Sequence, residues 1–281
     1  SRTDRGVHAL MNCYTLPLMD FNVPTDRFKR LVNQSLLKRQ HEIIVNEVLL
    51  VPADYHPRKA AVCREYIYRI GVPRWKIGQI PYKPIELFQA FPASELFRIL
   101  PLPHLDMDKF EEAANLLRGV HDFKSFSFQP RESDDTVRNL EINVIPANEM
   151  TFARECSNPI DIYHIHFKSR AFLHNQVRRL VGALLSYSSS GTAKLADIQE
   201  LLDNPSSKAW SPKMMIAEPW GLYLSRLYYD KSSFEGSIRT YENVEEDEKV
   251  DLDKMPGFID TSQIDMKLKE SSPRRDDDCD T

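Results

Sequence analysis

Apolar residues recur every three or four positions in four stretches of the chain, a spacing that predicts helices because it puts them on one face. The stretches are residues 25–38, 106–118, 171–188 and 195–204. Thr25 can cap the first helix, and Gly119 ends the second. Two stripes are expected to be buried: Phe28, Leu31, Val32, Ser35 and Leu36 in the first helix, and Leu173, Val177, Leu180, Val181, Leu184 and Leu185 in the third.

Other stretches are rich in β-branched residues or alternate apolar and polar side chains, which is the pattern of strands. They are residues 9–17, 43–51, 62–72, 125–128, 136–145, 161–167 and 221–229. Residues 73–106 show no clean period and are predicted to be irregular, with a helical turn near residues 94–99. Strands and helices in mixed order indicate an α+β fold, with a mixed or antiparallel sheet flanked by helices.

The composition narrows the class of protein. A chain of 281 residues, 42% of them apolar, suffices for one large domain or two modest ones. Its apolar runs are much shorter than the roughly 18 residues of a membrane span. Four scattered cysteines without a CxxC pair argue against a disulfide framework and a thiolate zinc site, and for reduced, intracellular chemistry. The nine glycines form neither GxGxxG nor GxxxxGK(S/T), so a glycine-rich phosphate loop is not expected.

The net charge of −4 is unevenly distributed along the chain. Residues 241–281 hold 14 acidic and 6 basic residues, a net of −8, which leaves +4 for residues 1–240. Few apolar residues accompany this acidic charge, so residues 230–281 are predicted to form a disordered tail. The mildly basic remainder permits an anionic partner.

The opening segment places a carboxylate, Asp4, between Arg2 and Arg5 and follows it with Gly6, which allows a sharp turn. The flanking cations favour the ionised form of Asp4, which suits a nucleophile or a base. On chemistry alone, a solvated surface loop is the commoner explanation of such a segment. Both explanations stay open at this point.

Residues 1–9, SRTDRGVHA, resemble the signature loop of the TruA-type tRNA pseudouridine synthases, which reads roughly G/S-R-T-D-x-G-V-H-A. Further similarities follow in the family's order. Residues 55–58, Y-H-P-R, are similar to the family's F-H-A-R segment. The others are R-x-Y-x-Y at 64–68, G-x-H-D-F-x-x-F at 119–126, T-x-R at 136–138, F-L-x-x-x-V-R-x-x-V-G within 171–182, and an alanine followed by G-L-x-L at 217–224. The resemblance covers residues 1–229 and leaves out the acidic tail. The basic residue Arg5 makes the pattern most similar to the eukaryotic pseudouridine synthase-like branch.

This resemblance implies an isomerase that breaks the base–sugar bond of a uridine in tRNA and joins carbon 5 of the base to the ribose, without cofactor or metal. The favoured targets are tRNA positions 38 to 40, in the anticodon stem-loop. Asp4 would be the catalytic aspartate, acting as a nucleophile or as a base on the ribose. Tyr66 would stack on the target base, Arg178 would pair with the aspartate, and Arg2 would lie near the flipped nucleotide.

The resemblance also implies an organisation: two pseudo-repeated ferredoxin-like (RRM-like) subdomains with the catalytic cleft between them. Residues 1–53 would be the remainder of the N-terminal catalytic subdomain, and residues 54–229 the C-terminal one. Family members carry several dozen residues before the signature loop, so we expect this chain to be N-terminally truncated. A homodimer is allowed, and the branch slightly favours the mitochondrion over the cytoplasm or nucleus.

Other interpretations compete with this one. A catalytically silent RNA-binding module stays open, and a glycosidase is weaker because Asp4 has no evident carboxylate partner. Without the resemblance, Tyr66 would be read as an ordinary half-buried strand tyrosine and Arg178 as a helix-surface arginine.

Three further groups of polar residues are expected to lie outside the site. Arg179 is predicted to contact phosphate or solvent. His164 and His166 share a strand face but lack a third metal ligand, so they are predicted to face solvent or RNA. His121 and Asp122 are predicted to lie at a packed helix end.

Overall fold

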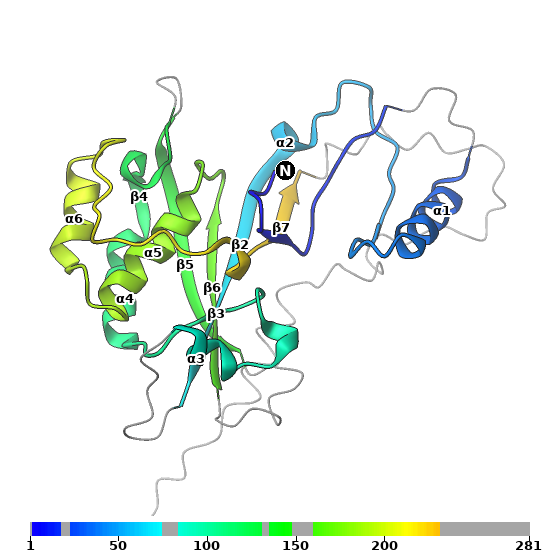
Figure 1. Cartoon of the computed structure of the whole chain (residues 1–281). Coiled ribbons are helices and arrows are strands. Elements are labelled where there is room, and N and C mark those ends of the chain that lie inside the picture. The colour runs from blue at the N-terminus through cyan, green and yellow to red at the C-terminus, as the bar shows by residue number, and fades with distance from the viewer. Residues whose placement is uncertain (1, 18–22, 75–83, 131–134, 148–159, 231–281) are drawn as a thin grey trace, which may run out of the picture. The chain divides into compact units, whose positions relative to one another are not determined.

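The computed structural model (Figure 1) describes residues 2–17, 23–74, 84–130, 135–147 and 160–230. All of these ranges belong to one contact unit, Ser1–Ile238. The acidic tail that we predict to be disordered lies outside them, apart from residue 230. None of the helices in these ranges is long and apolar enough to cross a bilayer.

A seven-stranded mixed sheet organises the described residues, with the strand order β1-β7-β2-β6-β5-β4 and with β3 attached to β2 (Figure 1). The strands are β1 His8–Ala9, β2 Ala61–Pro73, β3 Leu100–Pro101, β4 Gly119–Asp122, β5 Val137–Ala147, β6 Ile160–Ser169 and β7 Leu222–Tyr229. The pairs β7–β2, β2–β6, β6–β5 and β5–β4 are antiparallel. β1 joins β7, and β3 joins β2, in parallel. The predicted α+β fold with a mixed, mostly antiparallel sheet is therefore confirmed.

Helices occupy the stretches between the strands. They are α1 Thr25–Lys38, α2 Pro57–Ala60, α3 Pro84–Gln89, α4 Met107–Leu117, α5 Gln176–Ser188 and α6 Leu195–Asp203, with 3-10 turns η1 Ala93–Glu95, η2 Lys124–Phe126 and η4 Pro219–Gly221. α4 begins where the carboxylate of Asp106 accepts a hydrogen bond from the backbone N–H of Lys109, at 3.1 Å. It ends before Gly119, whose φ of 97° suits a glycine.

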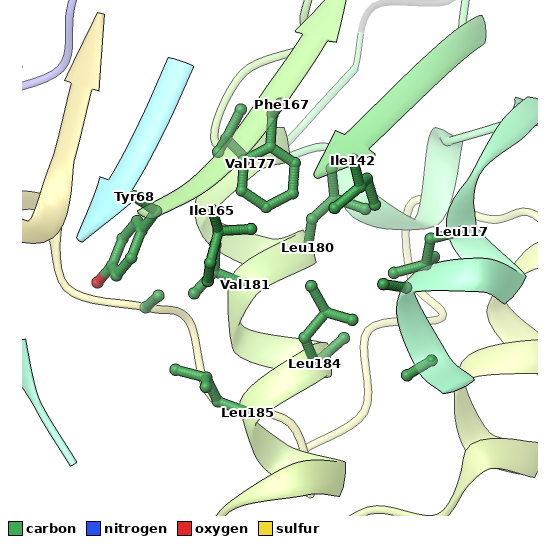
Figure 2. Packing of buried hydrophobic residues seen from close by; sticks show 14 of the residues in the cluster. Tyr68, Leu117, Ile142, Ile165, Phe167, Val177, Leu180, Val181, Leu184 and Leu185 are labelled. Atoms are coloured by element: carbon green, nitrogen blue, oxygen red, sulfur yellow. The ribbon is translucent and has the colours of Figure 1, made fainter. Parts of the chain in front are cut away.

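The apolar stripe of α5 packs against the inner face of the sheet and forms the main core (Figure 2). Leu180, Val181, Leu184 and Leu185 are fully buried, as their spacing predicted. They meet side chains from four other elements: Tyr68 of β2, Ile142 of β5, Ile165 and Phe167 of β6, and Leu117 of α4. Burying an aliphatic or aromatic side chain contributes about 1.5–3 kcal/mol, so this packing fixes α5 on the sheet.

Three strand predictions were wrong in extent or type. Residues 43–51 form no strand, and Ile43 and Ile44 are exposed there, because strand pairing needs a neighbouring segment that these residues do not have among the described ones. Residues 9–17 contribute only Ala9, to β1. Residues 125–128 instead include the end of η2.

Two helix predictions also need correction. α1 is present, but none of its residues is buried, and Leu31 is 52% exposed, so its apolar stripe does not join the core. α5 starts at Gln176 rather than at residue 171, because Asn175 before it has the left-handed conformation, with φ of 59°. His121 and Asp122, placed by the sequence at a packed helix end, instead lie in β4.

The segment before β7 crosses α5 at very short range. A β-carbon at Gly182 would lie 1.9 Å from the carbonyl oxygen of Met215, so only glycine fits there. Hydrogen bonds hold the contact on both sides, from Met215 N to Ser186 Oγ at 3.1 Å and from Ala217 N to Arg178 O at 3.1 Å. The segment is thereby fixed to the helix.

We predict that Gly182→Ala destabilises the protein by about 1–3 kcal/mol, because the added methyl group must push the Met215 backbone away. An alanine in an uncrowded helix interior would instead stabilise it by about 1 kcal/mol, so the sign of the change is decisive. Urea unfolding of the two proteins measures it. An unchanged or increased free energy of unfolding would contradict the close contact.

Candidate active site

The loop that carries Asp4 turns sharply and is attached to the sheet directly after the turn. The backbone N–H of Val7 donates to the Asp4 carbonyl at 3.1 Å, and Gly6 has φ of 82°. A β-carbon at Gly6 would also lie 3.1 Å from Cγ of Pro219. His8 then pairs with Tyr223 of β7, which places the loop beside the start of that strand.

The side chain of Asp4 is 40% exposed, and one ionisable neighbour, His174, lies close to it. His174 Nε2 is 3.8 Å from Asp4 Oδ1, beyond hydrogen-bond range but close enough for an ion pair when the imidazole is protonated. Among the described residues, His174 is the ion-pair partner of Asp4 within 4 Å. The carboxylate therefore keeps one side open to a ligand.

Hydrogen bonds fix the chain that leads from His174 into α5. Leu173 N donates to Gln176 Oε1 at 2.8 Å, and Phe128 N donates to the carbonyl of His174 at 3.0 Å. Asn175 then makes the left-handed turn that starts the helix. The backbone on which His174 stands is thus held from both sides.

Arg178 lies in the first turn of α5 and is held by bonds that do not involve Asp4. Its Nε donates to the carbonyl of Ala217 at 2.7 Å, and its Nη1 donates to Asn175 Oδ1 at 3.1 Å. A guanidinium carries five N–H donors, so these two bonds leave three donors for other partners. The structure places Arg178 on α5, four residues after His174, but shows no ion pair between Arg178 and Asp4.

Tyr66 lies in the middle of β2, between β7 and β6. Its partners in the sheet are Leu224 and Phe167. Its ring is half-buried and meets the ring of Phe172 edge to face, with centroids 5.1 Å apart. Because Phe172 lies two residues before His174, the contacts Asp4–His174 and Phe172–Tyr66 bring the loop, the tyrosine and the start of α5 together.

Arg2 is the remaining predicted site residue, and two further residues of the site were not predicted. Arg2 is exposed and makes no side-chain bond or ion pair within the described part of the chain. Phe172 and His174 were not predicted as site residues, although His174 lies four residues before Arg178, a spacing that would put both on one face of the helix predicted at residues 171–188.

The prediction that Arg179 contacts phosphate or solvent was wrong. This residue is only 6% exposed, and its Nη1 donates to the carbonyls of Ser125 and Ser127 at 3.1 and 2.5 Å. Its guanidinium also lies over the ring of Trp210, 4.9 Å from the centroid. Burial lowers the pKa of Arg179. Arg179 therefore holds the η2 turn against α5.

His164 and His166 make no metal site with the described residues, which hold no group of three or more ligand side chains. His166 Nδ1 lies 2.8 Å from Glu65 Oε1, and that hydrogen bond lowers the pKa of Glu65. His164 is half-buried beside Arg69, 3.3 Å away. Burial first, and then Arg69, lower the pKa of His164 to about 4.

We predict that His164 makes stability fall as the pH is lowered from about 6.5 toward 4. In this window the unfolded chain binds a proton at His164 and the folded protein does not, so the free energy of unfolding rises with pH. Urea unfolding at several pH values should show a shallower fall for His164→Gln. The same substitution at the exposed His104 is the matched control and should keep the original slope. Identical slopes for His164→Gln and the unmodified protein would contradict this role.

The chain is similar to known tRNA pseudouridine synthases. A family model described as tRNA pseudouridine synthase matches residues 113–230. The chain is 32% identical over 232 residues to tRNA pseudouridine synthase A of Staphylococcus aureus (strain MRSA252), with 83% of this chain and 75% of that protein covered. It is 29% identical over 235 residues to tRNA pseudouridine synthase-like 1 of Homo sapiens, with 82% and 73% covered.

Proposed function

Because the chain belongs to the TruA-type tRNA pseudouridine synthases, a family of isomerases, we propose that it converts uridine to pseudouridine in the anticodon stem-loop of tRNA, with Asp4 as the catalytic residue. The observation that carries the proposal is the position of the Asp4 carboxylate. It is partly exposed on a sharp turn, 3.8 Å from His174, and this histidine is two residues from the ring that contacts Tyr66.

The proposed reaction exchanges one bond of the ribose for another. The bond from the ribose carbon 1′ to the base nitrogen 1 breaks, the base turns while it stays bound, and carbon 1′ joins carbon 5. The proton of carbon 5 is released to solvent, and nitrogen 1, which has lost its bond to the ribose, takes up a proton from solvent. An ionised Asp4 carboxylate can assist as a nucleophile or as a base on the ribose, and its open side gives the nucleotide access.

Tyr66 is proposed to hold the base during this turn. A uridine must leave its stack to reach the carboxylate, and an aromatic face replaces part of the lost stacking, worth about 1–3 kcal/mol per base. Phe172 contacts Tyr66 edge to face and so supports its orientation from the side.

Arg178 and Arg2 are proposed to bind the nucleotide around Asp4. Arg178 is held in place by Ala217 and Asn175, and its three remaining donors can reach a carboxylate or a phosphate when RNA is bound. It also lies in the first turn of α5, where the helix dipole favours anions. Arg2 precedes the turn and is free to approach the same nucleotide.

The proposal includes the organisation implied by the family: residues 1–53 as the remainder of an N-terminal ferredoxin-like subdomain, residues 54–229 as the C-terminal one, and the catalytic cleft between them. The parallel pairing of β1 with β7 supports it, since it joins the loop of the first part to the sheet of the second.

We predict that Asp4→Asn lowers turnover to below about one thousandth, because an amide cannot act as an anionic nucleophile or base. Affinity for tRNA should stay within a few-fold, since phosphate contacts dominate it. Release of tritium from carbon 5 of labelled uridine in tRNA measures turnover. Asp108 is an exposed residue of α4. The variant Asp108→Asn is therefore the matched control, and its turnover of tRNA should be normal. Normal turnover by Asp4→Asn would remove this residue from the mechanism, and none by the unmodified chain would favour a silent RNA-binding module.

We predict that Tyr66→Ala weakens transition-state binding by about 1–3 kcal/mol, whereas Tyr66→Phe keeps most of it, because the ring face supplies the stacking. The ratio kcat/KM from the tritium assay compares the two variants, and thermal unfolding checks that both fold. Equal damage by the two substitutions would show that the hydroxyl group, rather than the ring, carries the role.

A further inference from the structure

A basic hollow of about 360 Å³ lies where β2 begins. Its lining includes four cationic side chains, Arg58 and Lys59 of α2, Arg64 of β2 and Arg170 after β6, and no carboxylate. A surface hollow lined by cations alone is suited to an anion. Arg64 holds the backbone around the hollow by hydrogen bonds. The other three cations line the hollow and make no such bonds among the described residues.

Arg64 builds the hollow. Its guanidinium donates to the carbonyls of Arg58 at 2.6 Å, Arg170 at 2.5 Å and Ala61 at 3.3 Å. These bonds tie α2 and the end of β6 to the start of β2, and so bring the side chains of Arg58 and Arg170 to the same opening. Burial lowers the pKa of Arg64, and the charge of Arg58 lowers it further.

The other three cations, Arg58, Lys59 and Arg170, are exposed and make no side-chain hydrogen bond or ion pair within the described residues. Two other arginines of this region are each matched by an acid: Arg69 of β2 by Glu95 at 3.0 Å, and Arg74, directly after β2, by Asp161 at 2.6 Å. Gathering unmatched positive charges costs free energy unless an anion joins them. The hollow therefore concentrates positive charge that an anionic ligand would neutralise.

The hollow is next to the aromatic pair of the candidate active site. The regular β2–β6 register keeps Arg64 and Tyr66 on one face of β2, two residues or about 7 Å apart. On the other side, Ala171 lines the hollow and is followed directly by Phe172, which contacts Tyr66. A nucleotide whose base lies on Tyr66 carries its backbone phosphates close to this opening.

We propose that this hollow binds one backbone phosphate of the RNA substrate, beside the nucleotide that stacks on Tyr66. The planar donors of Arg58 and Arg170 match the oxygens of a phosphodiester, and Lys59 adds a point charge. Such a contact positions the RNA without reading its sequence. The identity of the ligand as RNA rests on the proposed function, whereas the anion site rests on the charges and geometry of the hollow.

The first test compares the affinity of the full chain for an unmodified tRNA transcript at several salt concentrations. Arg170→Gln and the double variant Arg58→Gln/Arg170→Gln should weaken binding about three- to tenfold near 0.1 M salt, and the double variant should reduce the slope of log K against log salt by about 0.7–0.9. Lys208→Gln removes the same charge from an exposed residue outside the hollow and should change neither quantity. Thermal unfolding should be unaltered, because the replaced side chains hold no other group.

The second test identifies the phosphate. Anticodon stem-loop oligoribonucleotides each carry one uncharged methylphosphonate linkage, at successive positions around the target uridine. The unmodified chain should lose affinity at one or two of these linkages, and the double variant should show no further loss there, as expected for two partners in one contact. Independent losses at every linkage, or a Lys208→Gln variant as weak as Arg170→Gln, would overturn the proposal.

These outcomes separate the two proposals. A chain that forms pseudouridine normally, while its hollow variants bind like the unmodified protein, contradicts the phosphate site alone. A chain that forms no pseudouridine, while its hollow variants lose affinity at a defined linkage, contradicts the proposed activity alone.

Discussion

The contact between α5 and the segment that leads into β7 is the constraint on which the candidate site depends. Gly182 lets the segment approach the helix, and Arg178 binds it through both its backbone carbonyl and its guanidinium, at Ala217. From the sheet side, the hydroxyl group of the buried Tyr68 donates a hydrogen bond to the carbonyl of Glu218 at 2.8 Å. Helix, sheet and segment therefore cannot move separately, and the side chains that stand on them keep their places.

The two halves of the site are held to different degrees. Tyr66 stands on a central strand with a neighbour on each side, and Arg178 stands on a helix that is buried along most of its length. The loop of Asp4 is tied more lightly, through the two residues of β1, the bonds from Leu10 and Met11 N–H to Leu224, and the contact at Pro219. Under the proposed function, the firmly held sheet and helix would set where the base lies, and the more lightly held loop would let the Asp4 carboxylate adjust to the nucleotide.

The sequence pattern predicted those helices and strands whose buried face follows from their own residue spacing. The stripe of α5 is an example, since its spacing alone identifies the buried face, and the alternation around Tyr66 placed β2 correctly. The strand prediction for residues 43–51 failed because a strand needs a neighbouring strand, which β propensity does not reveal. The stripe of α1 failed for the same reason, since an amphipathic helix says which face is apolar but not what covers it. Motifs located Asp4, Tyr66 and Arg178, but the hydrogen bonds of Arg178 to Ala217 and Asn175 became visible only when distant segments were brought together.

The arginines show why sequence alone does not separate structural residues from ligand-binding ones. Arg178 and Arg179 are neighbours on one helix, yet one leaves donors free and the other is buried on two carbonyls of η2. Arg64 likewise spends its guanidinium on backbone carbonyls, and by doing so it creates the opening that Arg58 and Arg170 line. The guanidinium groups differ in their partners. Those of Arg64, Arg178 and Arg179 bind carbonyl oxygens of their own chain. Those of Arg58 and Arg170 have no acid or carbonyl partner among the described residues, so all their donors remain for an external anion. If the hollow binds phosphate as proposed, the position of its charge follows from folding, because the backbone contacts of Arg64 determine where Arg58 and Arg170 meet.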